Sequence, residues 1–264
     1  MIVSLLVLAL APIAALFLFF YARDRHREPL FPLAATFLLG AGSLLPSAAT
    51  SLALERLTGL SSKSNNLLQL FLAALFVVGL VEEGAKFAVV RLYAWNRREF
   101  DEPYDGIMYS VAAALGFASV ENVLYVFNAG QGAAVLRALL AVPSHAFCGV
   151  LAGYFLGEAK FAAGRWQTIG LQVLGLALAV LAHAVYDFMV FALHLRPLLL
   201  LMLPVFAALS WVIFFRATRG QAAKSAHTRP VLAALTRLGV PPRSSPPESK
   251  AQPSEDKDSA QDGG

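Results

Sequence analysis

The stretch FVVGLVEEGAKFAVVRLY, residues 76–93, is apolar apart from a few residues, and its only charged side chains are Glu82, Glu83, Lys86 and Arg91. It lies in an apolar run long enough to cross a bilayer as a helix, which takes about 20 residues. A charged side chain inside such a helix is unfavourable by roughly 2.5–3.5 kcal/mol on insertion scales, and by default marks a functional site. The stretch therefore predicts a membrane helix that carries part of a polar site.

The composition of the whole chain agrees with this prediction. Of the 264 residues, 58% are hydrophobic and 14% are charged, whereas soluble domains are about half apolar and a quarter charged. The mean hydropathy of +0.63 indicates a membrane protein. The net charge of +4 comes from residues in short loops and the C-terminal segment, so we expect no nucleic-acid partner. Cys148 is the single cysteine, which excludes an intramolecular disulfide.

Seven apolar runs are long enough to span a membrane, which predicts an all-α, polytopic membrane protein. The expected spans are Ile2–Tyr21, Phe31–Leu54, Leu67–Tyr93, Tyr104–Phe127, Ala133–Gly157, Thr168–Leu193 and Pro197–Phe215. Residues 1–215 would form the transmembrane domain, with a catalytic core at about 67–193. Residues 216–264 are polar and Pro/Ser-rich towards the end, and we expect a basic, largely disordered cytoplasmic tail.

Basic residues alternate between the two sides of the expected membrane. Loops on one side hold Arg23, Arg25, Arg27, Arg91, Arg97, Arg98, Lys160 and Arg165, and the tail adds more. The opposite loops hold Arg56, Lys63, Arg137 and Arg196. Because cytoplasmic loops are enriched in Lys and Arg, this alternation predicts an N-terminus outside and a C-terminus inside.

The helical spacing within the third span explains only part of its charge. Lys86 follows Glu82 by four residues and Glu83 by three, so it can pair with either carboxylate. Adjacent residues point about 100° apart on a helix. The second glutamate therefore needs a partner on another helix, a proton or a metal ion.

The next two spans carry further polar residues. GIMYSVAAALGFASVENVLYVF, residues 106–127, contains Glu121 beside Asn122, and AVPSHAFCGVLAGYFLG, residues 141–157, contains His145. Each of these side chains alone is compatible with hydrogen bonding between helices in a membrane.

The sixth span, LALAVLAHAVYDFMVFAL at residues 176–193, contains His183 and Asp187. These residues are four apart and share one helix face, so the carboxylate can orient the imidazole. Four consecutive spans thus supply three glutamates, two histidines, an aspartate, a lysine and an asparagine. A purely structural role does not account for all eight.

Three functions remain open for this polar set. Two histidines and a glutamate suit a hydrolytic zinc site with an open position for water. In a metal-free version, a glutamate activates water directly while His and Asn stabilise the oxyanion. The second function is a proton- or cation-coupled transporter that uses the same groups as a relay, although no matched halves with broken helices are present. The third, a non-catalytic receptor or scaffold, leaves the density of charge unexplained.

Four motifs on successive spans resemble those of the PrsW family of intramembrane proteases, which is related to the CAAX-protease and Abi superfamily. They are Glu82-Glu83-x-x-Lys86, Phe117-x-x-x-Glu121-Asn122, His145 and His183-x-x-x-Asp187. The resemblance covers about Leu67 to Phe191. CAAX proteases typically have arginine at the position of Phe87 and histidine at that of Glu121, so specificity for prenylated peptides is not expected.

The resemblance implies a metalloprotease of the bacterial cytoplasmic membrane that cuts a membrane protein or membrane-associated peptide, such as an anti-sigma factor. Its catalytic or metal-binding set would be Glu82, Glu83, Glu121, His145 and His183, supported by Lys86, Asn122 and Asp187. We expect zinc on Glu121, His145 and His183, with Glu83 or Glu121 as general base.

The site residues can meet only if they lie at similar depths in the membrane. With a rise of 1.5 Å per residue and a hydrocarbon core of about 30 Å, straight helices place Glu82 below the midplane and Glu121 and His183 above it. Convergence of these side chains therefore requires helix tilt or breaks, for which the candidates are Gly79, Gly84 and Pro143.

Overall fold

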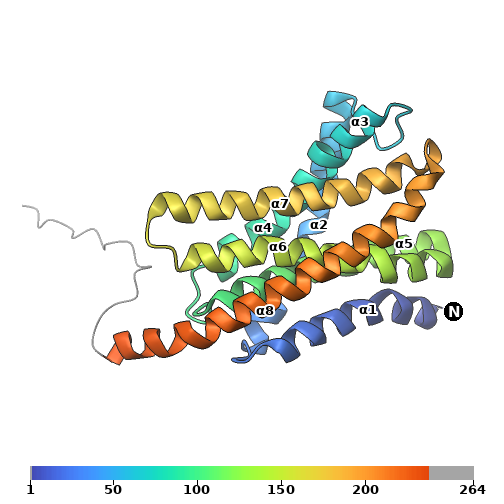
Figure 1. Ribbon diagram of the computed structural model, residues 1–264. Helices are drawn as coiled ribbons and strands as arrows, with labels where there is room; N and C mark the ends of the chain where they lie inside the picture. Colours follow the sequence, from blue (N-terminus) through green and yellow to red (C-terminus); the bar gives the residue numbers. More distant parts are fainter. Residues whose placement is uncertain (1, 238–264) are drawn as a thin grey trace, which may run out of the picture.

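The computed structural model describes residues 2–237, which fold into a bundle of long helices joined by short connections (Figure 1). Seven helices in this part of the chain are long and apolar enough to cross a membrane, which confirms the predicted all-α, seven-span fold. Large apolar side chains on the outside, including Phe31, Leu92, Trp166 and Leu198, are more than three-quarters exposed. A bilayer would cover such a surface.

The elements follow the apolar runs closely. The first half comprises α1 (Ile2–Arg23), α2 (Leu30–Thr58), α3 (Leu67–Leu72), the π-helical segment η1 (Ala73–Gly79), α4 (Leu80–Val89) and the π-helical segment η2 (Val90–Ala94). The second half comprises α5 (Pro103–Leu136), the π-helical segment η3 (Arg137–Ala141), α6 (Val142–Lys160), α7 (Arg165–Phe191), the 3₁₀ turns η4 (Ala192–His194) and η5 (Pro197–Leu201), and α8 (Met202–Arg237).

Local sequence explains several element boundaries. Asn66 caps α3, because its side-chain oxygen accepts hydrogen bonds from the backbone N–H groups of Leu68 and Gln69. The long α5 contains a kink at Gly130, whose φ of 78° lies in the left-handed region that favours glycine. This kink separates the fourth span from the fifth.

Helix α8 extends further than the apolar run that predicts it. The expected span ends at Phe215, followed by a tail expected to be largely disordered, whereas the helix continues to Arg237. The change from apolar to polar residues marks the end of a membrane-spanning stretch, but it does not end a helix when good helix formers follow. Residues 238–264 of the expected tail lie outside the described residues.

Helix α5 is the centre of the bundle and packs against α6, α2, α1 and α8. It approaches α6 and α2 at glycines. A Cβ on Gly153 of α6 would overlap the backbone of Gly106, and one on Gly116 would overlap the carbonyl of Phe37 in α2. Because lipid supplies no hydrophobic driving force between helices, such close backbone contacts are a major source of their association.

We predict that Gly153→Ala destabilises the protein although alanine is the better helix former. The added methyl group must push α5 and α6 apart, and such overpacking costs about 1–3 kcal/mol. The matched control is Gly170→Ala in α7, where the added methyl group meets no atom within 4 Å. Thermal unfolding in detergent should show a lower Tm for the first variant only; an equal Tm would contradict the packing argument.

The loop between α1 and α2 is held against the start of α5. His26 Nδ1 lies 3.0 Å from Glu102 Oε2, and the Tyr109 hydroxyl donates to Glu28 Oε2 at 2.6 Å. Glu28 is only 3% exposed. Burial raises its pKa to about 7, opposed by the Tyr109 hydrogen bond and reinforced by the negative charge of Asp24.

This burial predicts a pH-dependent stability. Because the pKa of Glu28 is raised in the folded state, its contribution is present below about pH 4.5 and is lost as the pH rises through about 7. Glu28→Gln should flatten the fall in Tm between pH 5 and 8, measured in detergent. Glu55→Gln, near the other end of α2, should keep the wild-type profile. Parallel profiles for wild type and Glu28→Gln would refute the prediction.

Candidate active site

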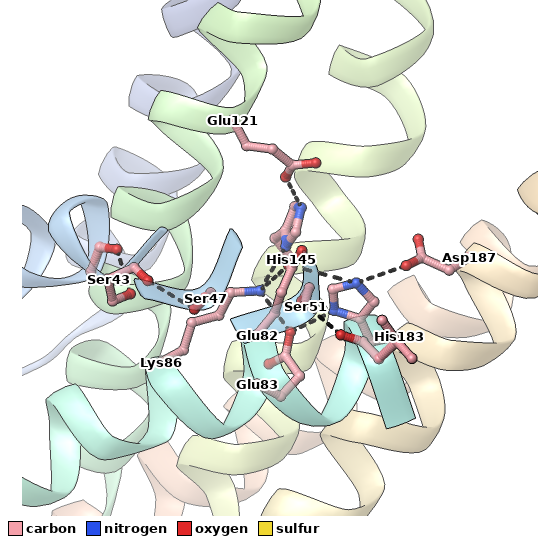
Figure 2. A network of polar contacts seen from close by, with 12 residues as sticks. Ser43, Ser47, Ser51, Glu82, Glu83, Lys86, Glu121, His145, His183 and Asp187 are labelled. Atoms are coloured by element: carbon pink, nitrogen blue, oxygen red, sulfur yellow. Dashed lines mark hydrogen bonds and ion pairs between the residues drawn. The ribbon is translucent and has the colours of Figure 1, made fainter. Parts of the chain in front are cut away.

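The ammonium group of Lys86 lies among several of the polar side chains singled out in the sequence (Figure 2). Its Nζ is 2.8 Å from Glu83 Oε1 and 3.3 Å from Glu82 Oε2 on the same helix. It also lies 3.2 Å from His145 Nδ1 on α6 and 4.1 Å from the centre of the Phe117 ring on α5. One lysine thus contacts both glutamates of α4 and reaches two neighbouring helices.

His183 on α7 is held by carboxylates on both sides of its ring. Its Nδ1 is 2.7 Å from Glu83 Oε1. On the other side, Nε2 is 3.2 Å from Asp187 Oδ2 and 3.8 Å from Glu82 Oε2. The expected orientation of the imidazole by Asp187 is therefore present, and Glu83 fixes the opposite nitrogen.

His145 completes the cluster from α6. Its Nε2 is 2.8 Å from Glu121 Oε2 on α5, and its ring centre is 5.5 Å from that of His183. Figure 2 shows Glu121 approaching His145 from the side opposite Lys86 and Glu82. The five residues expected to be catalytic or metal-binding thus converge from four helices.

Two of the π-helical segments come directly before a site-bearing helix. Segment η1 ends at Gly79, three residues before Glu82, and η3 ends one residue before Val142 at the start of α6. A π-helical turn contains an extra residue, so it shifts the following side chains around the helix axis, and such turns are frequent at functional sites. Breaks near Gly79 and Pro143 are therefore present, whereas Gly84 lies within regular α4.

Arg137 is a site contact that the sequence pattern missed. The charge pattern predicts a loop residue that helps to set topology, whereas the NH2 nitrogen of Arg137 lies 3.1 Å from Glu121 Oε2. Its Nε donates to Asn122 Oδ1 at 2.7 Å. Arg137 is the first residue of the π-helical segment η3, which follows the kink at Gly130, and neither feature could be read from residue spacing.

Asn122 supports the site from outside the histidine cluster. Its Nδ2 donates to the carbonyl of Ala9 in α1 at 2.7 Å, and its Oδ1 accepts from Arg137. Because the amide donor is bonded to α1, Asn122 connects two helices and does not point a donor at the histidines.

Two overlapping groups of side chains can hold a metal ion. The ligand atoms of Glu82, His145 and His183 lie within 4.8 Å of one another, as do those of Glu83, Cys148 and His183. The first group has the nitrogen and oxygen donors of a catalytic zinc site. Glu121, expected among the ligands, belongs to neither group and instead contacts His145.

The ion pairs of Lys86 predict how its substitution changes the stability of the protein. Lys86→Met leaves two glutamates without their cation in a buried site, and breaking a buried ion pair in this way costs roughly 3–5 kcal/mol. The double variant Lys86→Met/Glu83→Gln removes one carboxylate charge as well and should recover part of this loss. Denaturation in detergent would measure both changes. A single variant as stable as wild type would show that Lys86 does not stabilise the cluster.

Comparison with known proteins gives one consistent result. The family profile described as PrsW family intramembrane metalloprotease matches residues 28–214. Protease PrsW of Oceanobacillus iheyensis is 35% identical over 75% of this chain and 91% of its own length. The proteins of the same name from Bacillus subtilis and Halalkalibacterium halodurans are 34% and 37% identical, over 76% and 79% of this chain and 88% and 93% of theirs. No solved structure shows significant similarity to the chain.

Proposed function

Because the chain belongs to the PrsW family of intramembrane metalloproteases, we propose that its buried Glu/His cluster hydrolyses a peptide bond of a membrane-embedded substrate. Family membership favours proteolysis over the transporter alternative, since the matched proteins are proteases. The substrate we propose is a membrane protein of the anti-sigma-factor type, and the location is the bacterial cytoplasmic membrane.

The observation that carries this proposal is the way each histidine is held. Glu121 contacts Nε2 of His145, and Glu83 contacts Nδ1 of His183. The other nitrogen of His183, Nε2, lies 3.8 Å from Glu82 Oε2 and 3.2 Å from Asp187 Oδ2, and the other nitrogen of His145, Nδ1, lies 3.2 Å from Lys86 Nζ. A metal ion bound beside Glu82 would replace Asp187 and Lys86 as the neighbour of these two nitrogens. A carboxylate on the far nitrogen of a histidine is the usual device for orienting a metal ligand.

The residues that would hold the metal ion are Glu82, His145 and His183. Two imidazoles and one carboxylate fit zinc, leaving a position open for water. Zinc would supply Lewis-acid polarisation of the scissile carbonyl and activation of that water.

Accessibility separates the two glutamates that are candidates for the general base. The Glu83 side chain is 3% exposed, and its Oε1 already contacts both Lys86 and His183. The Glu121 side chain is 19% exposed, so it is the more accessible of the two. We therefore assign proton abstraction to Glu121, and assign orientation of His183 to Glu83 and Asp187. Lys86 pairs with both α4 glutamates and balances one of their two negative charges.

This assignment predicts the behaviour of variants reconstituted in liposomes with a single-span reporter bearing an anti-sigma-factor membrane segment. Glu121→Gln should lower kcat by about 10²–10⁴, the range for loss of a general base. His145→Ala and His183→Ala should lose activity and bound zinc together. His194→Ala, on an exposed histidine whose one hydrogen bond within residues 2–237 is with the Phe191 carbonyl, is the control. Wild-type cleavage by His183→Ala would contradict the assignment.

Treatment with a metal chelator distinguishes the metal-dependent protease from the metal-free protease. A metal-dependent enzyme should lose activity with a chelator and regain it with zinc. Chelator-resistant cleavage that still requires Glu121 would support the metal-free version. Proton flux into the liposomes without any proteolysis would support the transporter alternative, in which the same groups act as a proton relay.

A further inference from the structure

Arg137 is a second cation within the buried part of the site. It lies in η3, and its guanidinium carbon is 4.1 Å from the centre of the Tyr125 ring. The Arg137 side chain therefore has three partners on one stretch of α5: Glu121, Asn122 and Tyr125. Its side chain is 13% exposed. An arginine that only set topology would extend towards the membrane surface, whereas this one is folded inward.

Arg137 contacts one carboxylate oxygen of Glu121, the proposed general base. Arg137 and His145 both approach Glu121 Oε2, at 3.1 and 2.8 Å. Two groups that can carry positive charge therefore lie against the same carboxylate oxygen. The contacts described for Glu121 leave its Oε1 as the oxygen able to accept a proton.

The position of Arg137 is itself fixed from a third helix. Asn122 is fully buried and bonded to the Ala9 carbonyl of α1, so its Oδ1 is a rigid acceptor for Arg137 Nε. The planar guanidinium can contact the amide and the carboxylate at the same time, which the single ammonium of lysine does less well. A chain of contacts thus runs from α1 through Asn122 and Arg137 to Glu121.

We propose that Arg137 is a positioning residue for catalysis: it holds the Glu121 carboxylate on His145 so that Oε1 faces the reacting water. This inference rests on the proposed role of Glu121. It concerns the rate of the chemical step and predicts no direct contact between Arg137 and the substrate.

The test compares kcat and KM for four variants in the same liposomes: Glu121→Gln, Arg137→Met, Arg137→Lys and Glu121→Gln/Arg137→Met. Arg137→Met should lower kcat by about 10–100-fold, the usual effect of losing a group that orients a catalytic residue, with little change in KM. Arg137→Lys should recover part of the rate. The double variant should be no slower than Glu121→Gln alone, because the two residues act in one step.

Arg196→Met is the matched control, since Arg196 is exposed and contacts only a backbone carbonyl. It should behave as wild type. Wild-type kcat in Arg137→Met, or losses that multiply in the double variant, would overturn the positioning role while leaving Glu121 in place. Full activity of Glu121→Gln would instead refute the proposed function. A fall in kcat for Arg137→Met that lysine does not relieve, with reduced Tm, would show a structural role and also overturn the inference.

Discussion

Lys86 places a positive charge inside a bundle of membrane helices, and the arrangement of the site follows from the need to pair it. An isolated ion in a medium of low polarity is strongly unfavourable, whereas a paired and hydrogen-bonded one is tolerated. Lys86 contacts Glu82 and Glu83 on its own helix and His145 on α6. Glu83 in turn reaches His183. His145 and Glu83 thus link α6 and α7 to the same small region, so pairing the charge also brings the candidate catalytic groups together.

Close packing of the helix backbones at glycines brings the polar side chains of neighbouring helices within contact distance. Gly153 brings α6 onto α5, and Gly116 brings α2 onto α5, while Gly79 lies against the backbone of Val180 in α7, where a Cβ would be 3.2 Å from the carbonyl oxygen. The π-helical segments η1 and η3 then set the rotation of the side chains that follow them. Small residues control how far apart the helices are, and the π-helical turns control which way their polar residues face.

The fold and most of the site could be predicted from the sequence, and the reason is physical. Bilayer thickness fixes the length of an apolar span, and ionisable residues inside a span are rare enough that Glu82, Glu121, His145 and His183 together mark a site. Residue spacing gives no account of π-helical turns or kinks. Spacing therefore places Arg137 in a loop, and it does not single out Glu82 as the carboxylate that groups with His145 and His183.

The central claim is that Glu82, His145 and His183 together hold one metal ion within the membrane domain. X-ray absorption at the zinc edge of the zinc-loaded protein tests it most directly. We predict one zinc ion per chain with only nitrogen and oxygen ligands at about 2.0–2.1 Å, two of them imidazoles, and loss of the ion in His145→Ala. A sulfur ligand, which would place the ion at Cys148, or a full complement of zinc in His145→Ala would contradict the claim.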